Sequence, residues 1–164
     1  MNIVGNWAEA PTKDQWVARD KIMLDICAQA EKYARLAVNK GDSYSYSADS
    51  HYQTMFLSRE IENCFRCGNW LSTIVMAAAV IETFLSGYLE KGSQSENFLD
   101  SIKFPEKELY KKIIDSRNSI MHLRNKSYAS SFYKTPPEEL FELAKTGLWL
   151  SYFLTDFVLY TKHS

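Results

Sequence analysis

Cysteine is scarce in this sequence, and neither sign of charge dominates it. The three cysteines among 164 residues follow no pairing pattern, which argues against a disulfide framework and fits a reducing cytoplasm. With 19 basic and 20 acidic residues, the formal net charge is -1. This balance argues against a globally basic nucleic-acid coat, and any contact with nucleic acid must come from a local patch.

Several site motifs are also missing. The sequence has no phosphate-binding glycine loop, no helix with metal-ligand spacing and no nucleophile elbow. The pair Cys64 and Cys67 has the CxxC spacing. The other available ligands are not spaced from this pair in a way typical of zinc sites; they are Cys27, His51 and His163. We expect two half-buried cysteines here, and neither a metal ion nor a cofactor.

No segment looks like a targeting or membrane-spanning segment. The N-terminus has neither a basic start nor the long apolar run of a secretory signal. Residues 70–89 are apolar enough to need a check, and their only charged residue is Glu82. Because a carboxylate in the middle of a bilayer costs a few kcal/mol or more, the sequence predicts a helix buried in a soluble bundle.

The apolar spacing and the helix-boundary signals predict five helices, with one further short turn after Ser95. Thr12 and Gln15 form a capping box, Gly68 ends the second helix, and Asn69 caps the third. Thr135, Pro136 and two following acids start the last helix. The expected helices span residues 12–40, 50–67, 70–90, 105–124 and 135–160.

No segment reads as a strand, and no internal repeat is present. The expected fold is therefore all-α: an up-and-down helical bundle in a single domain, residues 1–164. Residues 50–160 would form the four-helix core, and residues 12–40 an additional N-terminal helix.

Arg117 lies in the middle of an apolar stripe. On a helical wheel the nearby apolar side chains fall within about 60° of it on both sides; they are Tyr110, Ile113, Ile114, Ile120 and Met121. An unpaired buried guanidinium costs several kcal/mol. Either Glu82 pairs with Arg117, or part of the stripe faces a cleft or a second subunit.

His122 lies about 140° from Arg117 on the same wheel. Asn118 and His122 are four residues apart and share a face. Because Arg117 and His122 do not converge on one ideal helix, a site using both needs a bend or a second copy of the chain.

The stretch Arg117-Asn118-Ser119-Ile120-Met121-His122 resembles the motif of the HEPN superfamily (higher eukaryotes and prokaryotes nucleotide-binding domains). That motif is an arginine, a polar residue, three further residues and a histidine, late in a bundle helix. The preceding segment GNWLSTIVMAAAVIETFLSGYL is similar to the family's second bundle helix, and the resemblance covers about residues 50–160.

The resemblance implies a metal-independent endoribonuclease of the toxin or defence kind, in which two protomers line one cleft with their motifs. His122 would act as general acid or base, and Arg117 would stabilise the scissile phosphate. Asn118 would orient the histidine or a phosphate oxygen. Glu82 would tune Arg117. The product would be a 2′,3′-cyclic phosphate, and an antitoxin or other protein is a possible partner.

Charge after the motif fits an RNA substrate. Residues 116–134 contain four basic residues and no acid, interleaved with aromatics. Arg124 and Lys126 can contact phosphates, and Tyr128 can stack on an unpaired base. In one HEPN subgroup a tyrosine two positions after the histidine accepts a silencing nucleotide; Arg124 stands there in this sequence.

Two alternatives remain open. Arg117 can be a structural partner of Glu82, with His122 capping the end of its helix. The chain would then be a catalytically inactive HEPN-like module that binds a protein or nucleotide partner. A helical adaptor that works through its aromatic-rich last helix is a related possibility.

Overall fold

The computed structural model describes residues 2–5, 9–37, 48–89, 93–121 and 134–163. These residues form six helices and no strand, which confirms the predicted all-α class. The helices are α1 (Lys13–Ala37), α2 (Ala48–Cys67), α3 (Trp70–Ser86), α4 (Ser95–Ser101), α5 (Lys107–Met121) and α7 (Pro137–His163).

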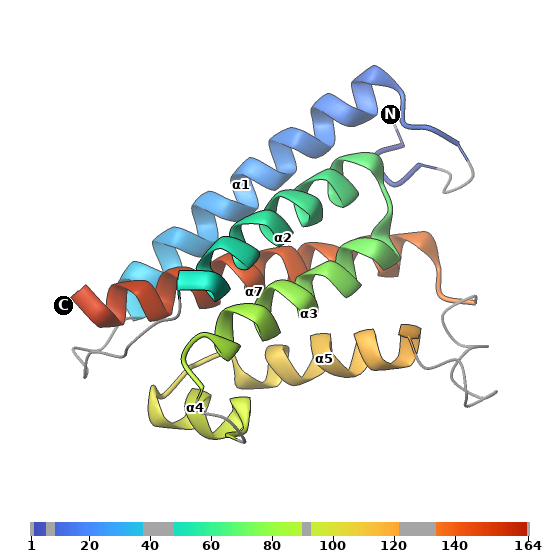
Figure 1. Ribbon diagram of the computed structural model, residues 1–164. Coiled ribbons are helices and arrows are strands. Elements are labelled where there is room, and N and C mark those ends of the chain that lie inside the picture. The colour runs from blue at the N-terminus through green and yellow to red at the C-terminus, as the bar shows by residue number, and fades with distance from the viewer. Residues whose placement is uncertain (1, 6–8, 38–47, 90–92, 122–133, 164) are drawn as a thin grey trace.

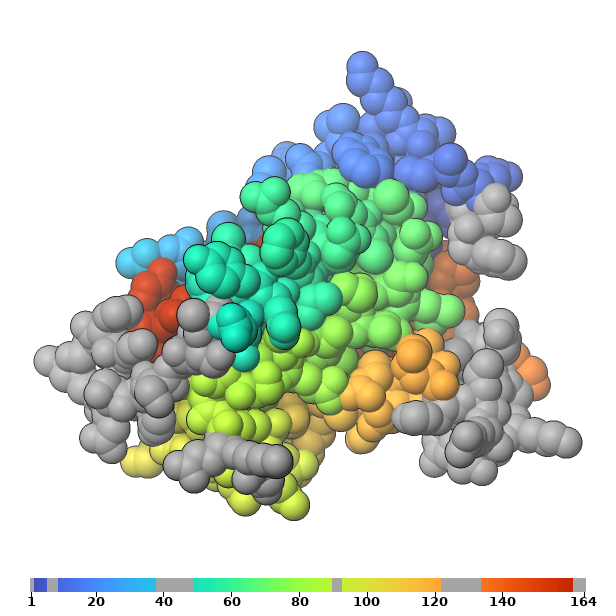
Figure 2. Space-filling view, in the orientation of Figure 1, coloured from blue at the N-terminus to red at the C-terminus, as the bar shows by residue number. Residues whose placement is uncertain are grey.

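Helix α3 is the centre of the bundle. It packs against α2 on one side, α5 on the other and α7 behind, and α1 lies along α7 and α2 (Figure 1). The surfaces of α2 and α3 make up the middle of the face seen in Figure 2. Nine side chains of α3 are buried, as expected for a helix that is apolar nearly all round.

The core is rich in phenylalanine. Phe153 on α7 stacks on Trp149 at 4.8 Å and on Phe104 at 5.3 Å between ring centroids. Helices α3 and α7 approach closely because their facing residues are small: a Cβ placed on Gly147 would lie 3.0 Å from the Cβ of Ala77. Small residues at this crossing let α7 lie directly behind α3.

Most predicted helix boundaries have the expected chemistry. The backbone N–H of Thr12 donates to Gln15 at 2.9 Å and that of Gln15 donates to Thr12 Oγ1 at 3.2 Å, which is the capping box. Gly68 has a φ of 78° and ends α2, with its N–H bonded to Phe65 O and that of Asn69 to Cys64 O. These two bonds form a Schellman motif.

Other boundaries differ from the prediction. Asn69 occupies the N-cap position of α3, but its side chain makes no capping hydrogen bond. Helix α3 ends at Ser86 instead of residue 90, because the N–H groups of Gly87 and Tyr88 bond three residues back in a tighter turn. Helix α5 begins at Lys107, two residues after Pro105.

The additional N-terminal helix belongs to the packed core. Met23, Ala30 and Ala34 are buried, whereas Tyr33 and Leu36 are 41% and 76% exposed. Tyr33 nevertheless contacts α7, because its ring centroid lies 5.0 Å from that of Phe153 and 5.7 Å from that of Trp149.

A buried arginine fastens the N-terminal segment to the end of α2. Arg19 is 2% exposed. Its guanidinium donates to the carbonyl oxygens of Ile3, Val4 and Arg66 at 2.9, 3.0 and 3.2 Å. It also lies 5.0 Å from the ring centroid of Trp70. Three carbonyl dipoles and an aromatic face replace the water lost on burial.

Candidate active site

Arg117 lies where the helical wheel placed it. It stands on α5 with Ile113 fully buried one turn before it and Tyr110 buried one turn further back. The side chain of Arg117 is 24% exposed, so the guanidinium is half-buried at the junction of α5 and α3. Met121, at the end of α5, is 59% exposed.

The predicted pairing of Arg117 with Glu82 is confirmed. Nη2 of Arg117 donates to Oε1 of Glu82 across the α3–α5 contact. The Glu82 side chain is 41% exposed, so water still reaches this ion pair. A pair of this kind stabilises the fold modestly, by roughly 0–1 kcal/mol. It holds the guanidinium in place without burying it completely.

Tyr110 lines the same α3–α5 contact. Burial raises the pKa of its phenol, and the negative charge of Glu82 raises it further, whereas a hydrogen bond with Ser95 lowers it. The phenol is therefore neutral at physiological pH. It can donate or accept a hydrogen bond but supplies no phenolate.

The described residues contain only part of the predicted site. Arg117 and Glu82 are brought together, and Asn118 follows on α5 with its side chain half-buried. His122 and the expected RNA-contacting residues Arg124, Lys126 and Tyr128 lie outside the described residues. The convergence of His122 with Arg117 therefore stays a prediction.

An open groove of about 530 Å³ lies between α5 and the start of α7. It is lined by Lys112, Thr135, Glu138, Glu139, Glu142, Leu143 and Thr146. Lys112 is about 140° from Arg117 around α5, so the groove and the ion pair lie on different sides of that helix. Three glutamates in its wall repel a phosphate backbone, and we do not assign this groove to RNA.

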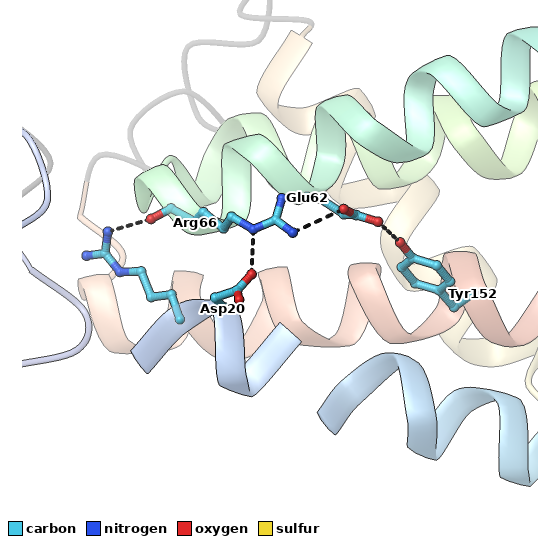
Figure 3. A network of polar contacts seen from close by, with 5 residues as sticks. Asp20, Glu62, Arg66 and Tyr152 are labelled. Carbon is cyan, nitrogen blue, oxygen red and sulfur yellow. Dashed lines mark hydrogen bonds and ion pairs between the residues drawn. The ribbon is translucent and has the colours of Figure 1, made fainter. Parts of the chain in front are cut away.

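A polar network joins α1, α2 and α7, and the sequence did not predict it (Figure 3). Nε of Arg66 donates to Asp20 Oδ1 at 2.7 Å, and Nη2 of Arg66 donates to Glu62 Oε2 at 3.3 Å. The hydroxyl of Tyr152 donates to the other oxygen of Glu62. Glu62 and Arg66 are four residues apart on α2, so their pairing follows from helical spacing. The contacts of Asp20 and Tyr152 with them are made only by packing between helices.

The network continues to Cys27, but this thiol is not activated. Burial raises the pKa of Cys27 to about 11, and the negative charge of Glu62 adds to that effect, while a hydrogen bond with Tyr152 opposes it. Burial and the hydrogen bond to Glu62 also raise the pKa of Tyr152. Since the thiolate is the nucleophile, this network holds helices together and does not supply one.

The cysteines of the CxxC pair are free and half-buried, as expected. Burial raises the pKa of Cys64. Across the described part of the chain, no three His, Cys, Asp or Glu side chains are grouped as a metal site would require. His51 is exposed at the start of α2.

None of the helices that the structure describes has the length and hydropathy needed to cross a membrane. Comparison of the chain with protein-family models, with curated protein sequences and with solved structures found no match. The resemblance to the HEPN superfamily thus depends on the motif at 117–122 and on its place late in a bundle helix.

Proposed function

We propose that the protein is a metal-independent endoribonuclease of the toxin or defence type that works as a homodimer. The observation that supports it is the position of Arg117: a half-buried, solvent-reachable cation near the end of α5, held by Glu82. An arginine fixed in this way is preorganised to receive a phosphate. His122 and Asn118 complete the proposed catalytic set.

The proposed reaction needs one proton acceptor, one proton donor and a cation. His122 accepts the proton of an RNA 2′-hydroxyl, whose oxygen attacks the adjacent phosphorus. The bond from phosphorus to the 5′-oxygen breaks, and that oxygen takes a proton from a second histidine, from the partner motif or from water. The product is a 2′,3′-cyclic phosphate. The charge that develops on the phosphoryl oxygens is stabilised by Arg117.

Glu82 leaves Arg117 able to take part. Of the five guanidinium N–H donors, the hydrogen bond to Glu82 uses the Nη2 group. The remaining donors can reach two phosphate oxygens, and the carboxylate keeps the arginine from swinging into solvent. Arg124, Lys126 and Tyr128 would hold the flanking RNA, in a cytoplasmic setting where an antitoxin can bind.

The same ion pair also favours a second function. Because the negative charge of Glu82 offsets the positive charge of Arg117, the motif at 117–122 can be purely structural. The protein would then be a catalytically inactive HEPN-like module that dimerises and binds a protein or nucleotide. The two proposals differ in what His122 does, and a histidine variant separates them.

The test is cleavage of single-stranded RNA in excess EDTA, with product ends assayed for the cyclic phosphate. We expect wild-type protein to cleave, and His122→Ala to lose about 10²–10⁴-fold in rate. His163→Ala is the matched control, because it removes a histidine outside the motif. Helix content and oligomeric state are measured for each variant.

If His122→Ala cleaves as fast as wild type, the catalytic assignment is wrong. If wild-type protein forms a dimer and cleaves no RNA, the inactive module becomes the better account.

A further inference from the structure

The outer face of α2 exposes aromatic side chains in a regular line. Asp49, Tyr52, Phe56, Arg59 and Asn63 follow heptad spacing and are all exposed. Tyr52 is 64% exposed and Phe56 72%, with Met55 beside them at 49%. The buried residues of α2 lie on the opposite side, which they share with the core. This outer face therefore presents large apolar side chains to solvent.

The aromatic and the charged residues on this face are each placed symmetrically about one position in the sequence. Tyr52 and Phe56 lie two residues before and after Thr54, and Asp49 and Arg59 lie five residues before and after it. Neither Asp49 nor Arg59 makes an ion pair with another described residue. A helix with this pattern is complementary to an antiparallel copy of itself.

We propose that a second copy of this chain docks on the outer face of α2, with the two helices antiparallel about a two-fold axis level with Thr54. In this register Tyr52 of each chain packs on Phe56 of the other. Asp49 of each chain pairs with Arg59 of the other. A two-fold interface repeats each contact twice, so both ion pairs and both aromatic pairs form together.

This axis passes level with the ion pair of the candidate site. Met55 lies twelve residues before Cys67, the last residue of α2. Glu82 lies twelve residues after Trp70, the first residue of α3, and the two helices meet at the turn between Cys67 and Trp70. At 1.5 Å per residue both are about 18 Å from that turn. Glu82 in turn contacts Arg117 on α5. The point on α2 where the axis crosses is therefore level with Arg117.

Helices α2, α3 and α5 lie side by side (Figure 1). A two-fold axis running across them places the α3 and α5 of the second copy opposite those of the first. Both Arg117 side chains then lie at one level of the same interface. This last step rests on the proposed function, which needs two motifs at one cleft, whereas the pairing of the α2 helices does not.

The contact extends beyond one helix. A stable interface buries about 800 Å² on each partner, more than one stripe of α2 supplies. Helix α3 lies beside α2 on the same face of the molecule (Figure 2). Its partly exposed side chains include Val75, Met76 and Ala79. These residues are apolar and small to medium in size, so they permit close approach of the second copy.

The test is the oligomeric state by analytical ultracentrifugation over a range of concentrations. We expect the wild-type protein to form a dimer. Phe56→Glu should raise the dissociation constant of the dimer about tenfold or more, because a carboxylate replaces a central aromatic contact. Leu24→Glu is the matched control. Leu24 is also exposed, at 58%, but lies on α1, and its replacement should leave the dimer unchanged.

A charge exchange tests the register. Asp49→Arg and Arg59→Asp each place like charges opposite one another and should weaken the dimer. The double variant Asp49→Arg/Arg59→Asp should restore it. Circular dichroism checks helix content, because Asp49 lies in the first turn of α2. A monomeric wild type, a dimeric Phe56→Glu protein or a double variant without rescue would overturn the proposed interface.

RNA cleavage separates this inference from the proposed function. A wild-type dimer that cleaves no RNA contradicts the ribonuclease and leaves the interface standing. If monomeric Phe56→Glu protein cleaves at the wild-type rate, the ribonuclease stands and the shared cleft is overturned. The expected result is loss of both dimer and cleavage in Phe56→Glu, with both retained in Leu24→Glu.

Discussion

The guanidinium of Arg19 fills the space that a side chain at Gly68 would need. A Cβ on Gly68 would lie 2.5 Å from Nη1 of Arg19, and this nitrogen donates to the carbonyl of Arg66 at the end of α2. Gly68 also has a φ of 78°, in the left-handed region that favours glycine. The end of α2, the start of α1 and the N-terminal segment thus depend on one glycine.

Gly68→Ala should therefore be costly. The left-handed backbone costs about 1–2 kcal/mol with a Cβ, and displacing Arg19 weakens its hydrogen bonds. We expect a total loss of about 2–4 kcal/mol, measured by urea unfolding. Gly87→Ala is the control, since Gly87 has a φ of -69° and should change stability by less than about 1 kcal/mol. Equal effects of the two substitutions would contradict this account.

Local signals in the sequence predicted some of the helix ends and the central helix. The capping box at Thr12, the glycine after α2 and the apolar character of α3 each act over a few residues, so one sequence is enough to read them. Arg117 and Glu82 were also predictable, because each is a charge where the pattern requires an apolar residue.

Contacts made only by packing were not predictable. Arg19, Asp20 and Arg66 read as ordinary charged residues on helix surfaces, and only the folded bundle shows that Arg19 is buried and that Asp20 pairs with Arg66. The histidine of the candidate site belongs to the same class of problem. A bend in the helix or a second chain would have to bring His122 close to an Arg117 side chain, and helical periodicity predicts neither.

Asp156 makes stability depend on pH. Burial raises the pKa of this carboxyl to about 6, and the negative charge of Glu31 adds to the shift, while Arg35 opposes it. The folded protein thus holds this proton more tightly than the unfolded chain does. Its contribution to stability is present below the unfolded pKa, near pH 4, and is lost as pH rises through about 6.

Asp156→Asn should remove this dependence. We expect the variant to be more stable than wild type by about 1–2 kcal/mol at pH 7, and similar to wild type at pH 4. Thermal unfolding at several pH values measures the difference. Asp25→Asn is the control, because Asp25 is exposed on α1. A stability difference between Asp156→Asn and wild type that stays constant with pH would contradict the assignment.

The close crossing of α3 and α7 predicts intolerance at Gly147. A Cβ there would already lie 3.0 Å from Ala77, so the branched side chain of Gly147→Val should force the helices apart. We expect a loss of about 1–3 kcal/mol or more, measured by chemical denaturation. Thr146→Val, at the neighbouring half-exposed position, controls for a β-branched side chain in this helix and should be nearly neutral.

The ion pair between Arg117 and Glu82 can be assigned to structure or to catalysis by a double-mutant cycle. Because the two side chains are 24% and 41% exposed, we expect a coupling energy of only about 0.5–1 kcal/mol between Arg117→Ala and Glu82→Ala. Both variants should fold, and Arg117→Ala should abolish RNA cleavage. If Arg117→Ala unfolds the protein and the double variant Glu82→Ala/Arg117→Ala folds again, the ion pair is structural. The inactive module would then be favoured.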